Sequence, residues 1–210
     1  MNILILGAGN MGSALAKQFT AAGHAVSIAA TSLEKAKTVA AAIPGSTAVA
    51  AAGSAAGNDV VVVATPYEQA VAALQAAGPL AGKVVIDITN PLTADFMGLT
   101  IGHETSAAEE IAKALPGTDI AKAFNTLFAQ VIAEGPAFAD GHRARAFYAG
   151  DSDRAKSTAK SLIESIGFHP VDAGPLKNAR YLEPLAGLNI YFGYGAGLGT
   201  AIAPAWIGRG

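Results

Sequence analysis

The sequence contains no cysteine, few charged residues and few aromatic residues. Without cysteine, the 210-residue chain has no disulfide, no thiolate metal site and no cysteine nucleophile. Charged residues make up 14% of the chain, whereas hydrophobic residues make up 51%. This charged fraction is well below the usual quarter, and the apolar content is ample for a buried core. The net charge of −2 offers no basic field for a polyphosphate backbone, so we expect no nucleic acid partner.

Targeting and membrane signals are also weak. The apolar run at residues 3–6 is short, has no basic flank and leads directly into a glycine turn, unlike a signal peptide. Between Glu183 and Arg209 the chain carries no formal charge over a length that could span a bilayer. Pro184, Pro204 and several glycines interrupt this stretch. We therefore expect a buried helix and tail rather than a membrane span, and a cytoplasmic protein with no membrane partner.

The motifs of common hydrolytic and metal sites are missing. The sequence contains neither HExxH nor GxSxG, and its histidines are scattered at positions 24, 103, 142 and 169. Histidine, aspartate and glutamate do not cluster with the spacing of metal ligands, so we expect no metal. The sequence assigns no catalytic side chain.

What the sequence does contain is a regular alternation of apolar runs and helical segments. Strands are expected over residues 2–6, 25–30, 59–64, 83–88, 119–124, 144–149 and 169–172. Helices are expected over residues 12–22, 33–42, 67–77, 106–115 and 154–166, with a long glycine-rich helix from 177 to about 201. The run at 59–64 is apolar throughout, as in a parallel strand that is covered on both faces. Helices of this length between strands indicate right-handed crossovers.

The expected fold class is α/β. We predict a Rossmann-type, doubly wound, mainly parallel sheet with helices on both faces and a small C-terminal α/β extension that ends in a long helix. Residues 1–210 form a single dinucleotide-binding domain, with the Rossmann core at 1–125 and the extension at 126–210. We expect the extension to form the acceptor side of the site and the contact of a homodimer.

A GxGxxG turn directly follows the first expected strand and opens the first helix. In that context Gly7 permits the tight turn, Gly9 lets the backbone approach a pyrophosphate, and Gly12 lets the helix pack closely on the strand. The free N–H groups of the helix start then face the phosphates. The expected phosphate-binding residues are Gly7, Ala8, Gly9, Asn10, Met11 and Gly12.

The end of the second expected strand indicates which dinucleotide is bound. NAD-binding folds usually carry an acidic residue here, whereas this chain has Ala30. Thr31 and Ser32 can donate hydrogen bonds to a 2′-phosphate and Lys35 supplies a cation, although Ser32 can also be a simple helix cap. We therefore predict that the cofactor is NADP(H).

Polar residues and prolines follow the later strands, where an open α/β sheet binds its ligand. The candidate cofactor-binding residues are Ala64, Thr65, Pro66, Tyr67, Asn90, Pro91, Lys122, Ala123 and Asn125. Thr65 and Asn90 can bond the ribose or a phosphate, and Asn125 with the backbone of Ala123 can meet the carboxamide. Turn chemistry alone is the alternative for each of them.

Five motifs, in order, carry a resemblance to one family. They are GAGNMGSAL at 7–15, ATPYEQA at 64–70, DITNPL at 87–92, KAFN at 122–125 and GPLKNARYLEPLA at 174–186. With them the chain resembles the NADP-dependent oxidoreductases of coenzyme F-420. It is also similar to the cytosolic reductase domain of the STEAP-type metalloreductases, most closely over residues 106–127. The resemblance implies that NADPH lies across the strand ends with a flavin or deazaflavin ring stacked on its nicotinamide.

The same resemblance implies roles for particular residues. The turn from Gly7 to Gly12 would hold pyrophosphate, Thr31 and Ser32 the 2′-phosphate, and Ala123 with its neighbours the nicotinamide. F-420-type members often carry arginines near the 2′-phosphate, and this chain has none at that point.

The function predicted from these observations is hydride transfer between NADPH and an acceptor. The acceptor would be F-420, a flavin such as FMN or FAD, or a flavin-mediated ferric ion. Such a reaction needs two rings held together more than it needs acid or base groups. The alternatives are a non-catalytic NADP(H)-binding sensor and an imine or pyrroline-5-carboxylate-type reductase, whose glycine turn the GAGNMGSAL segment also resembles.

The C-terminal helix is the expected acceptor wall. Gly195 and Gly199 would lie one helical turn apart and admit a flat ring or another backbone, so the same face could equally pack a homodimer. Aromatic residues follow nearby at positions 191, 192, 194 and 206. Arg143, Arg145 and Arg180 are candidates for binding an acidic tail of the acceptor, or are surface charges.

Overall fold

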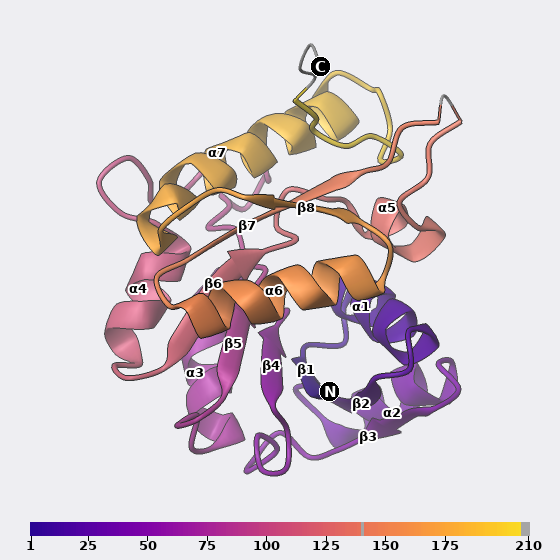
Figure 1. The fold of residues 1–210 in the computed structure, drawn as a ribbon, viewed down its shortest axis with the longest axis vertical. Helices are drawn as coiled ribbons and strands as arrows, with labels where there is room; N and C mark the ends of the chain where they lie inside the picture. The colour runs from indigo at the N-terminus through magenta and orange to yellow at the C-terminus, as the bar shows by residue number, and fades with distance from the viewer. Residues whose placement is uncertain (140, 207–210) are drawn as a thin grey trace.

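A single eight-stranded sheet organises the computed structural model, which describes residues 1–139 and 141–206 (Figure 1). The strands lie in the order β3-β2-β1-β4-β5-β6-β7-β8, and all neighbours are parallel except β6 and β7. Their bounds are β1 Asn2–Leu6, β2 Ala25–Ala29, β3 Ser46–Ala48, β4 Val60–Val63, β5 Val84–Asp87, β6 Asp119–Ala123, β7 Arg145–Gly150 and β8 His169–Asp172. The predicted doubly wound, mainly parallel fold is confirmed.

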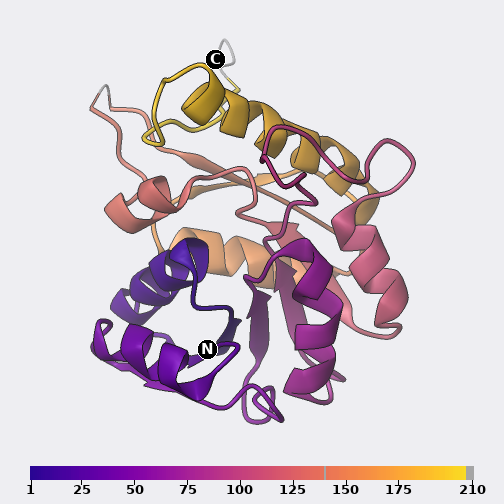
Figure 2. The same ribbon diagram turned by 180° about the vertical axis from the view of Figure 1, so that it is seen from behind.

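Helices cover both faces of this sheet. They are α1 Asn10–Ala21, α2 Leu33–Ala41, α3 Tyr67–Ala77, α4 Ala107–Ala114, α5 Ala129–Glu134, α6 Asp153–Ser165 and α7 Ala179–Ile190. Side chains of α1, α5 and α6 share one core cluster, and those of α3 and α4 share another. In Figure 1, α6 crosses the nearer face of the sheet, whereas α3 lies in front when the molecule is seen from behind (Figure 2).

Strand β4 shows why an uninterrupted apolar run is needed at the centre of the sheet. Val60 and Val62 pack into the cluster on one face, while Val61 and Val63 pack into the cluster on the other. Successive side chains of a strand point to opposite faces, so a strand covered on both sides must be apolar at every position.

Serine hydroxyls begin three of the helices. The Oγ atoms of Ser32, Ser106 and Ser152 accept hydrogen bonds from the backbone N–H three residues later, at 3.2, 3.2 and 3.0 Å. Each bond satisfies an N–H that has no acceptor within the helix. The helix starts near residues 33, 107 and 153 could therefore be predicted from the serine that directly precedes each of them.

The predicted long terminal helix is confirmed as far as residue 195 and is wrong only beyond it. Helix α7 ends at Ile190 and continues only as a π-helical segment, Tyr191–Gly195. Gly197 and Gly199 have φ of +74° and +77°, the left-handed region that glycine tolerates best. Gly195 and Gly199 therefore do not lie on one helical face, and the ring-binding stripe expected from their spacing does not form.

Two short elements, β3 and α5, lie outside the predicted strands and helices. Each is a short segment, three and six residues long, with too few positions to show a periodic pattern. Within residues 1–139 and 141–206, none of the helices is both long enough and apolar enough to cross a bilayer.

Phe19 provides a test of the core on the α1 side of the sheet. It is fully buried, with its ring edge-on to Phe124 at a centroid distance of 6.1 Å. We expect Phe19→Ala to lower the free energy of unfolding by about 3–5 kcal/mol, measured by urea denaturation. The control Tyr181→Ala removes a ring that is 73% exposed and should change it by at most about 0.5 kcal/mol. Equal losses in both variants would contradict this packing.

Candidate functional site

The turn between β1 and α1 is closed so tightly that only glycine fits at two of its positions. A Cβ on Gly7 would lie 2.3 Å from the carbonyl oxygen of Ala64, and φ of Gly7 is +122°. A Cβ on Gly12 would lie 2.0 Å from the carbonyl oxygen of Gly7. A Cβ on Gly9 would meet nothing within 4 Å. Two glycines therefore let the turn form, whereas Gly9 leaves open space above it.

The first turn of α1 points unpaired donors into that space. The helix begins its hydrogen bonding with Ser13 N to Gly9 O at 2.9 Å, so the N–H groups of Asn10, Met11 and Gly12 precede the first bond. Gly9 supplies no side-chain cap, and no acidic residue lies in the first turn. Unpaired N–H groups and the positive end of the helix dipole make this a favourable place for an anion.

A cavity of about 730 Å³ extends from this turn between the ends of β2 and β4 and the start of α3. It brings together eight of the residues predicted from sequence, namely Gly7, Ala8, Gly9, Thr31, Lys35, Ala64, Thr65 and Pro66. Glu68, Gln69, Ala72 and Ala73 of α3 also line it, and sequence reasoning missed them because no motif marks that helix face. Ser32 does not line the cavity, since its hydroxyl caps α2.

A second group of predicted residues meets at the ends of β5 and β6. The side-chain amide of Asn90 donates to the carbonyl oxygen of Asn125 at 2.9 Å, and the Asn125 amide donates to Asn90 Oδ1 at 2.9 Å. The Asn125 amide also donates to the carbonyl oxygen of Leu182 in α7 at 3.0 Å. This pair therefore fastens two strand ends to each other and to α7.

Several buried oxygen atoms beside this pair have no hydrogen-bond partner. They are Thr89 Oγ1, Asn125 Oδ1 and Thr126 Oγ1. Phe124, the residue that directly follows β6, has φ of +60°, an uncommon value for a bulky residue. Unpaired buried polar atoms and strained backbone are common at functional sites, because a bound ligand can form the missing hydrogen bonds and offset the cost of the strain.

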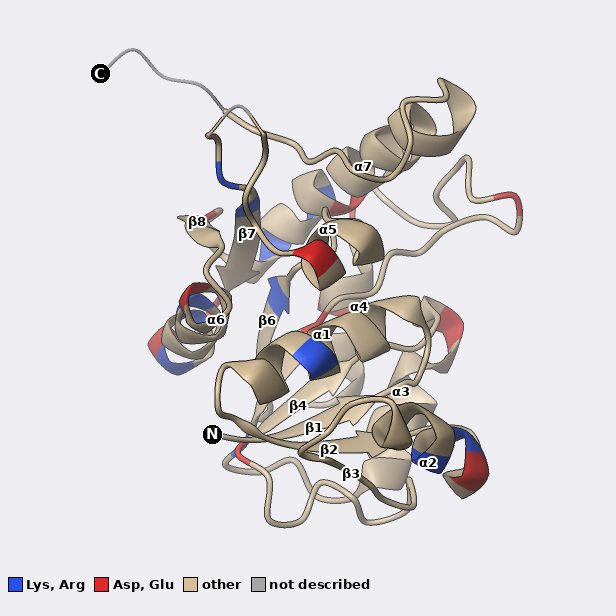
Figure 3. Ribbon diagram, turned by 90° about the vertical axis from the view of Figure 1, so that its right-hand side faces the viewer, with Lys and Arg blue, Asp and Glu red and all other residues tan. Residues whose placement is uncertain are grey.

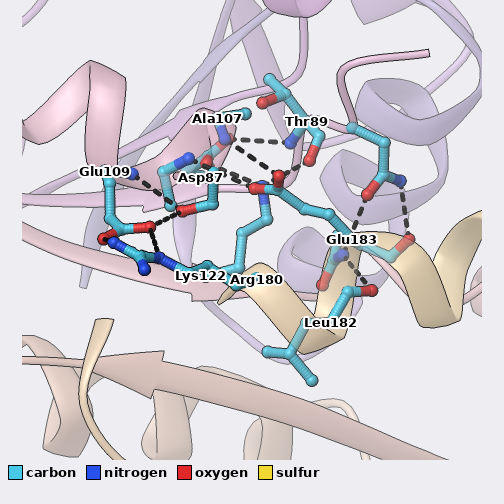
Figure 4. A network of polar contacts seen from close by, with 12 residues as sticks. Asp87, Thr89, Ala107, Glu109, Lys122, Arg180, Leu182 and Glu183 are labelled. Atoms are coloured by element: carbon cyan, nitrogen blue, oxygen red, sulfur yellow. Dashed lines mark hydrogen bonds and ion pairs between the residues drawn. The ribbon is translucent and has the colours of Figure 1, made fainter. Parts of the chain in front are cut away.

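Lys122 lies behind these strand ends and is completely buried. Its ammonium contacts Asp87 Oδ2 at 2.9 Å and Glu183 Oε1 at 2.8 Å, and donates to the carbonyl oxygen of Thr89 (Figure 4). Burial opposes the charge of this ammonium, but the two carboxylates outweigh burial and raise the pKa of Lys122. The Lys122 side chain is thus fully used by these buried contacts, so only the backbone of Lys122 could contact a cofactor.

The two carboxylates are themselves held by backbone donors. Glu183 accepts hydrogen bonds from the N–H groups of Ala107 and Ala108, at 2.9 and 3.2 Å, at the start of α4. Asp87 Oδ1 accepts one from Thr89 N at 2.8 Å. The sequence offered no sign of this buried trio, since its members are separated by 35 and 61 positions along the chain.

The structure also places two other candidate residues, Tyr67 and Arg180. Tyr67 starts α3 beside the cavity, and burial together with the charge of Glu110 raises the pKa of its phenol. Arg180 makes a two-pronged ion pair with Glu109, at 2.7 to 3.2 Å, and is therefore not free to bind an acidic tail as the sequence had suggested. This pair lowers the pKa of Glu109.

Two further cavities lie elsewhere among the described residues. One, of about 640 Å³, lies beside α1 and α5 and is lined by Lys17, Phe128 and Tyr194 among others. The other, of about 520 Å³, is lined by Arg143, Arg145 and His169. In the described part of the chain no group of acidic and histidine residues could hold a metal ion.

These features fit a dinucleotide across the strand ends. The glycine turn offers space and donors for two phosphates, and the cavity extends from it toward Thr31 and Lys35. Buried oxygen atoms without hydrogen-bond partners lie at the ends of β5 and β6.

Comparison with known proteins supports this interpretation. The profile of a family described as NADP oxidoreductase, coenzyme F-420-dependent, matches residues 2–91. A candidate F-420-dependent NADP reductase from Arthrobacter sp. FB24 superposes with a TM-score of 0.83, at 31% identity over 96% of both chains. The metalloreductase STEAP3 of Rattus norvegicus is 33% identical over 127 residues, which are 60% of this chain and 25% of that protein.

A more distant likeness concerns the fold alone. The reductive aminase of Aspergillus terreus superposes with a TM-score of 0.68 at 21% identity, over 93% of this chain and 63% of that one. Taken with the glycine turn and the cavity beside it, the full-length match at 31% identity shows that the chain belongs to the family of coenzyme F-420-dependent NADP oxidoreductases.

Proposed function

We propose that this oxidoreductase transfers a hydride between NADPH and a deazaflavin or flavin acceptor, with F-420, FMN and FAD as the candidate rings. The observation that carries the proposal is the glycine turn, which opens free space at Gly9 directly over the unpaired donors of α1. Its position at the start of a continuous cavity supports an extended dinucleotide rather than a single phosphate.

Each end of the dinucleotide has a candidate partner. The turn from Gly7 to Gly12 would hold the pyrophosphate, while Thr31 and Lys35 at the far side of the cavity would meet the 2′-phosphate. Asn90, Asn125 and the backbone around Ala123 would meet the nicotinamide end. The unpaired Oδ1 of Asn125 is an acceptor that suits a carboxamide N–H.

The chain contributes position rather than acid–base chemistry. The bound nicotinamide supplies the hydride, so the residues need only fix its ring and exclude water beside it. Asn90 and Asn125 are fixed by their reciprocal hydrogen bonds, and the bond to Leu182 sets the spacing to α7. A wall fixed in this way keeps one face of the ring covered and the other available to an acceptor.

The proposal also includes cytoplasmic placement and a homodimer formed through α7. Leu188 of α7 and the following Tyr191 and Phe192 expose between 41% and 52% of their surface. The second half of α7 and the described chain after it carry no charged residue (Figure 3). An uncharged apolar face of this kind is typical of a protein contact.

Imine reduction is the second candidate, favoured by the shared fold of the reductive aminase and imine reductase structures. A non-catalytic NADP(H) sensor is a third possibility, which membership of an oxidoreductase family disfavours.

The glycine turn is tested by Gly9→Ala. Gly9 has φ of −87° and no protein atom near its Cβ direction, so alanine fits the fold and should leave the melting temperature unchanged. A methyl group would stand where the phosphates approach, and we expect NADPH to bind at least about tenfold more weakly by calorimetry. Gly102→Ala, at a half-buried loop position where an added Cβ also meets nothing within 4 Å, is the matched control and should bind normally. Unchanged binding by Gly9→Ala would remove the phosphate assignment.

The 2′-phosphate assignment is tested by Lys35→Met. Loss of the cation should weaken NADPH binding about 3- to 10-fold while NADH binding stays the same. Lys37→Met removes a neighbouring cation that is paired with Glu34 at 2.9 Å and does not line the cavity, so both affinities should be retained. An equal loss for NADPH and NADH would refute a phosphate contact.

The acceptor is tested by stopped-flow mixing of the NADPH-loaded protein with F-420, FMN, FAD or a cyclic imine. We expect the nicotinamide absorbance to fall within a single turnover for at least one of the three flavin-type rings, because two stacked rings need no further group. Oxidation by the imine alone would support the second candidate. Tight NADPH binding without oxidation by any acceptor would support the sensor.

A further inference from the structure

The buried trio of Lys122, Asp87 and Glu183 carries an excess of negative charge. All three side chains are at most 1% exposed, and they bring together one ammonium and two carboxylates. The adjacent Glu109–Arg180 pair is neutral as a pair and partly exposed to solvent. One negative charge is therefore left uncompensated by side chains in a place that water does not reach.

The hydrogen bonds to both carboxylates come from donors. Within the described residues, Asp87 accepts from Thr89 N–H and from the Lys122 ammonium, and Glu183 accepts from two backbone N–H groups and contacts the same ammonium. Donors placed on carboxylate oxygens stabilise the charged form of the group. The start of α4 contributes a partial positive charge beside Glu183 but not a full one.

This charge lies directly behind the strand ends. Asp87 is the last residue of β5, and Lys122 immediately precedes Ala123, the last residue of β6. Residues along a strand are spaced by about 3.3 Å, so the trio lies within about 10 Å of the segments proposed to meet the nicotinamide. The oxidised nicotinamide ring carries a positive charge, and the reduced ring is neutral.

We propose that the buried excess charge of the Lys122–Asp87–Glu183 trio tunes the bound cofactor, binding NADP⁺ more tightly relative to NADPH and so making the bound NADPH a stronger hydride donor. The trio acts through the field at the ring and through the loop that it positions, not by touching the substrate. This inference rests on the proposed function, because it needs the nicotinamide at the ends of β5 and β6.

The ratio of the two affinities separates this role from a merely structural one. A loosened site would weaken NADP⁺ and NADPH alike and leave the ratio of their dissociation constants unchanged. A lost charge changes the ratio, because only the oxidised ring is charged and the phosphates are common to both forms. Because the trio is buried, added salt should screen its effect far less than that of a surface charge.

The experiment measures Kd for NADP⁺ and for NADPH by calorimetry in the wild type, Glu183→Gln and Asp87→Asn. Both variants remove one negative charge but disturb different hydrogen bonds, so one remains informative if the other fails to fold. We expect the ratio Kd(NADP⁺)/Kd(NADPH) to rise about 3- to 10-fold in each, a Coulomb effect across a protein interior. A tenfold change corresponds to about 30 mV in the potential of the bound pair.

Glu110→Gln is the matched control. It removes a carboxylate from the same helix α4, but from a partly exposed position where its partner is the Thr105 hydroxyl, which an amide oxygen can also bond. The ratio Kd(NADP⁺)/Kd(NADPH) of this variant should stay within twofold of the wild-type ratio. A ratio unchanged in both trio variants, or shifted equally in the control, would overturn the inference while leaving the proposed function intact. Failure of the wild type to bind either nucleotide would instead overturn both.

Discussion

One buried ammonium ties the strand ends of the Rossmann core to α7 of the C-terminal extension. Lys122 joins β6 to β5 through Asp87 and the carbonyl of Thr89, and to α7 through Glu183, which in turn receives the first N–H groups of α4. Burying three charges is costly unless hydrogen bonds satisfy their polar atoms, and here every polar atom of the trio has partners. The same pairing that offsets the cost fixes four elements in one geometry.

This constraint fixes the orientation of the backbone at the strand ends where a ring would be held. Thr89 is held at its N–H by Asp87 and at its carbonyl by Lys122, so the following Asn90 can meet Asn125 in a defined orientation. Asn125 and Lys122 contact α7 at the neighbouring positions Leu182 and Glu183. A change in the position of α7 would therefore be transmitted to both strand ends together.

The parts of the structure that could be predicted are those set by neighbours in sequence. The glycine turn, the serine caps and the apolar run of β4 follow from spacings of a few residues, and they were enough to define the sheet and one end of the cavity. The trio could not be predicted, because Asp87 and Glu183 meet Lys122 only after the sheet has formed. The end of α7 was missed for a different reason: glycines within a helical pattern do not reveal whether each will adopt a positive φ.

The loss of the predicted glycine stripe changes where an acceptor must be sought. With Gly197 and Gly199 outside any helix, the chain after α7 folds back so that Gly199 N bonds Gly193 O and Leu198 N bonds Phe192 O. A Cβ on Gly193 would lie 2.6 Å from the ring of Phe128, so this glycine already packs against protein. Gly193 therefore serves internal packing. The acceptor side then consists of the strand ends joined by Asn90 and Asn125, with the charge of the buried trio behind them. The reactivity of a bound ring would therefore depend on electrostatics set by the core rather than on side chains of the C-terminal segment.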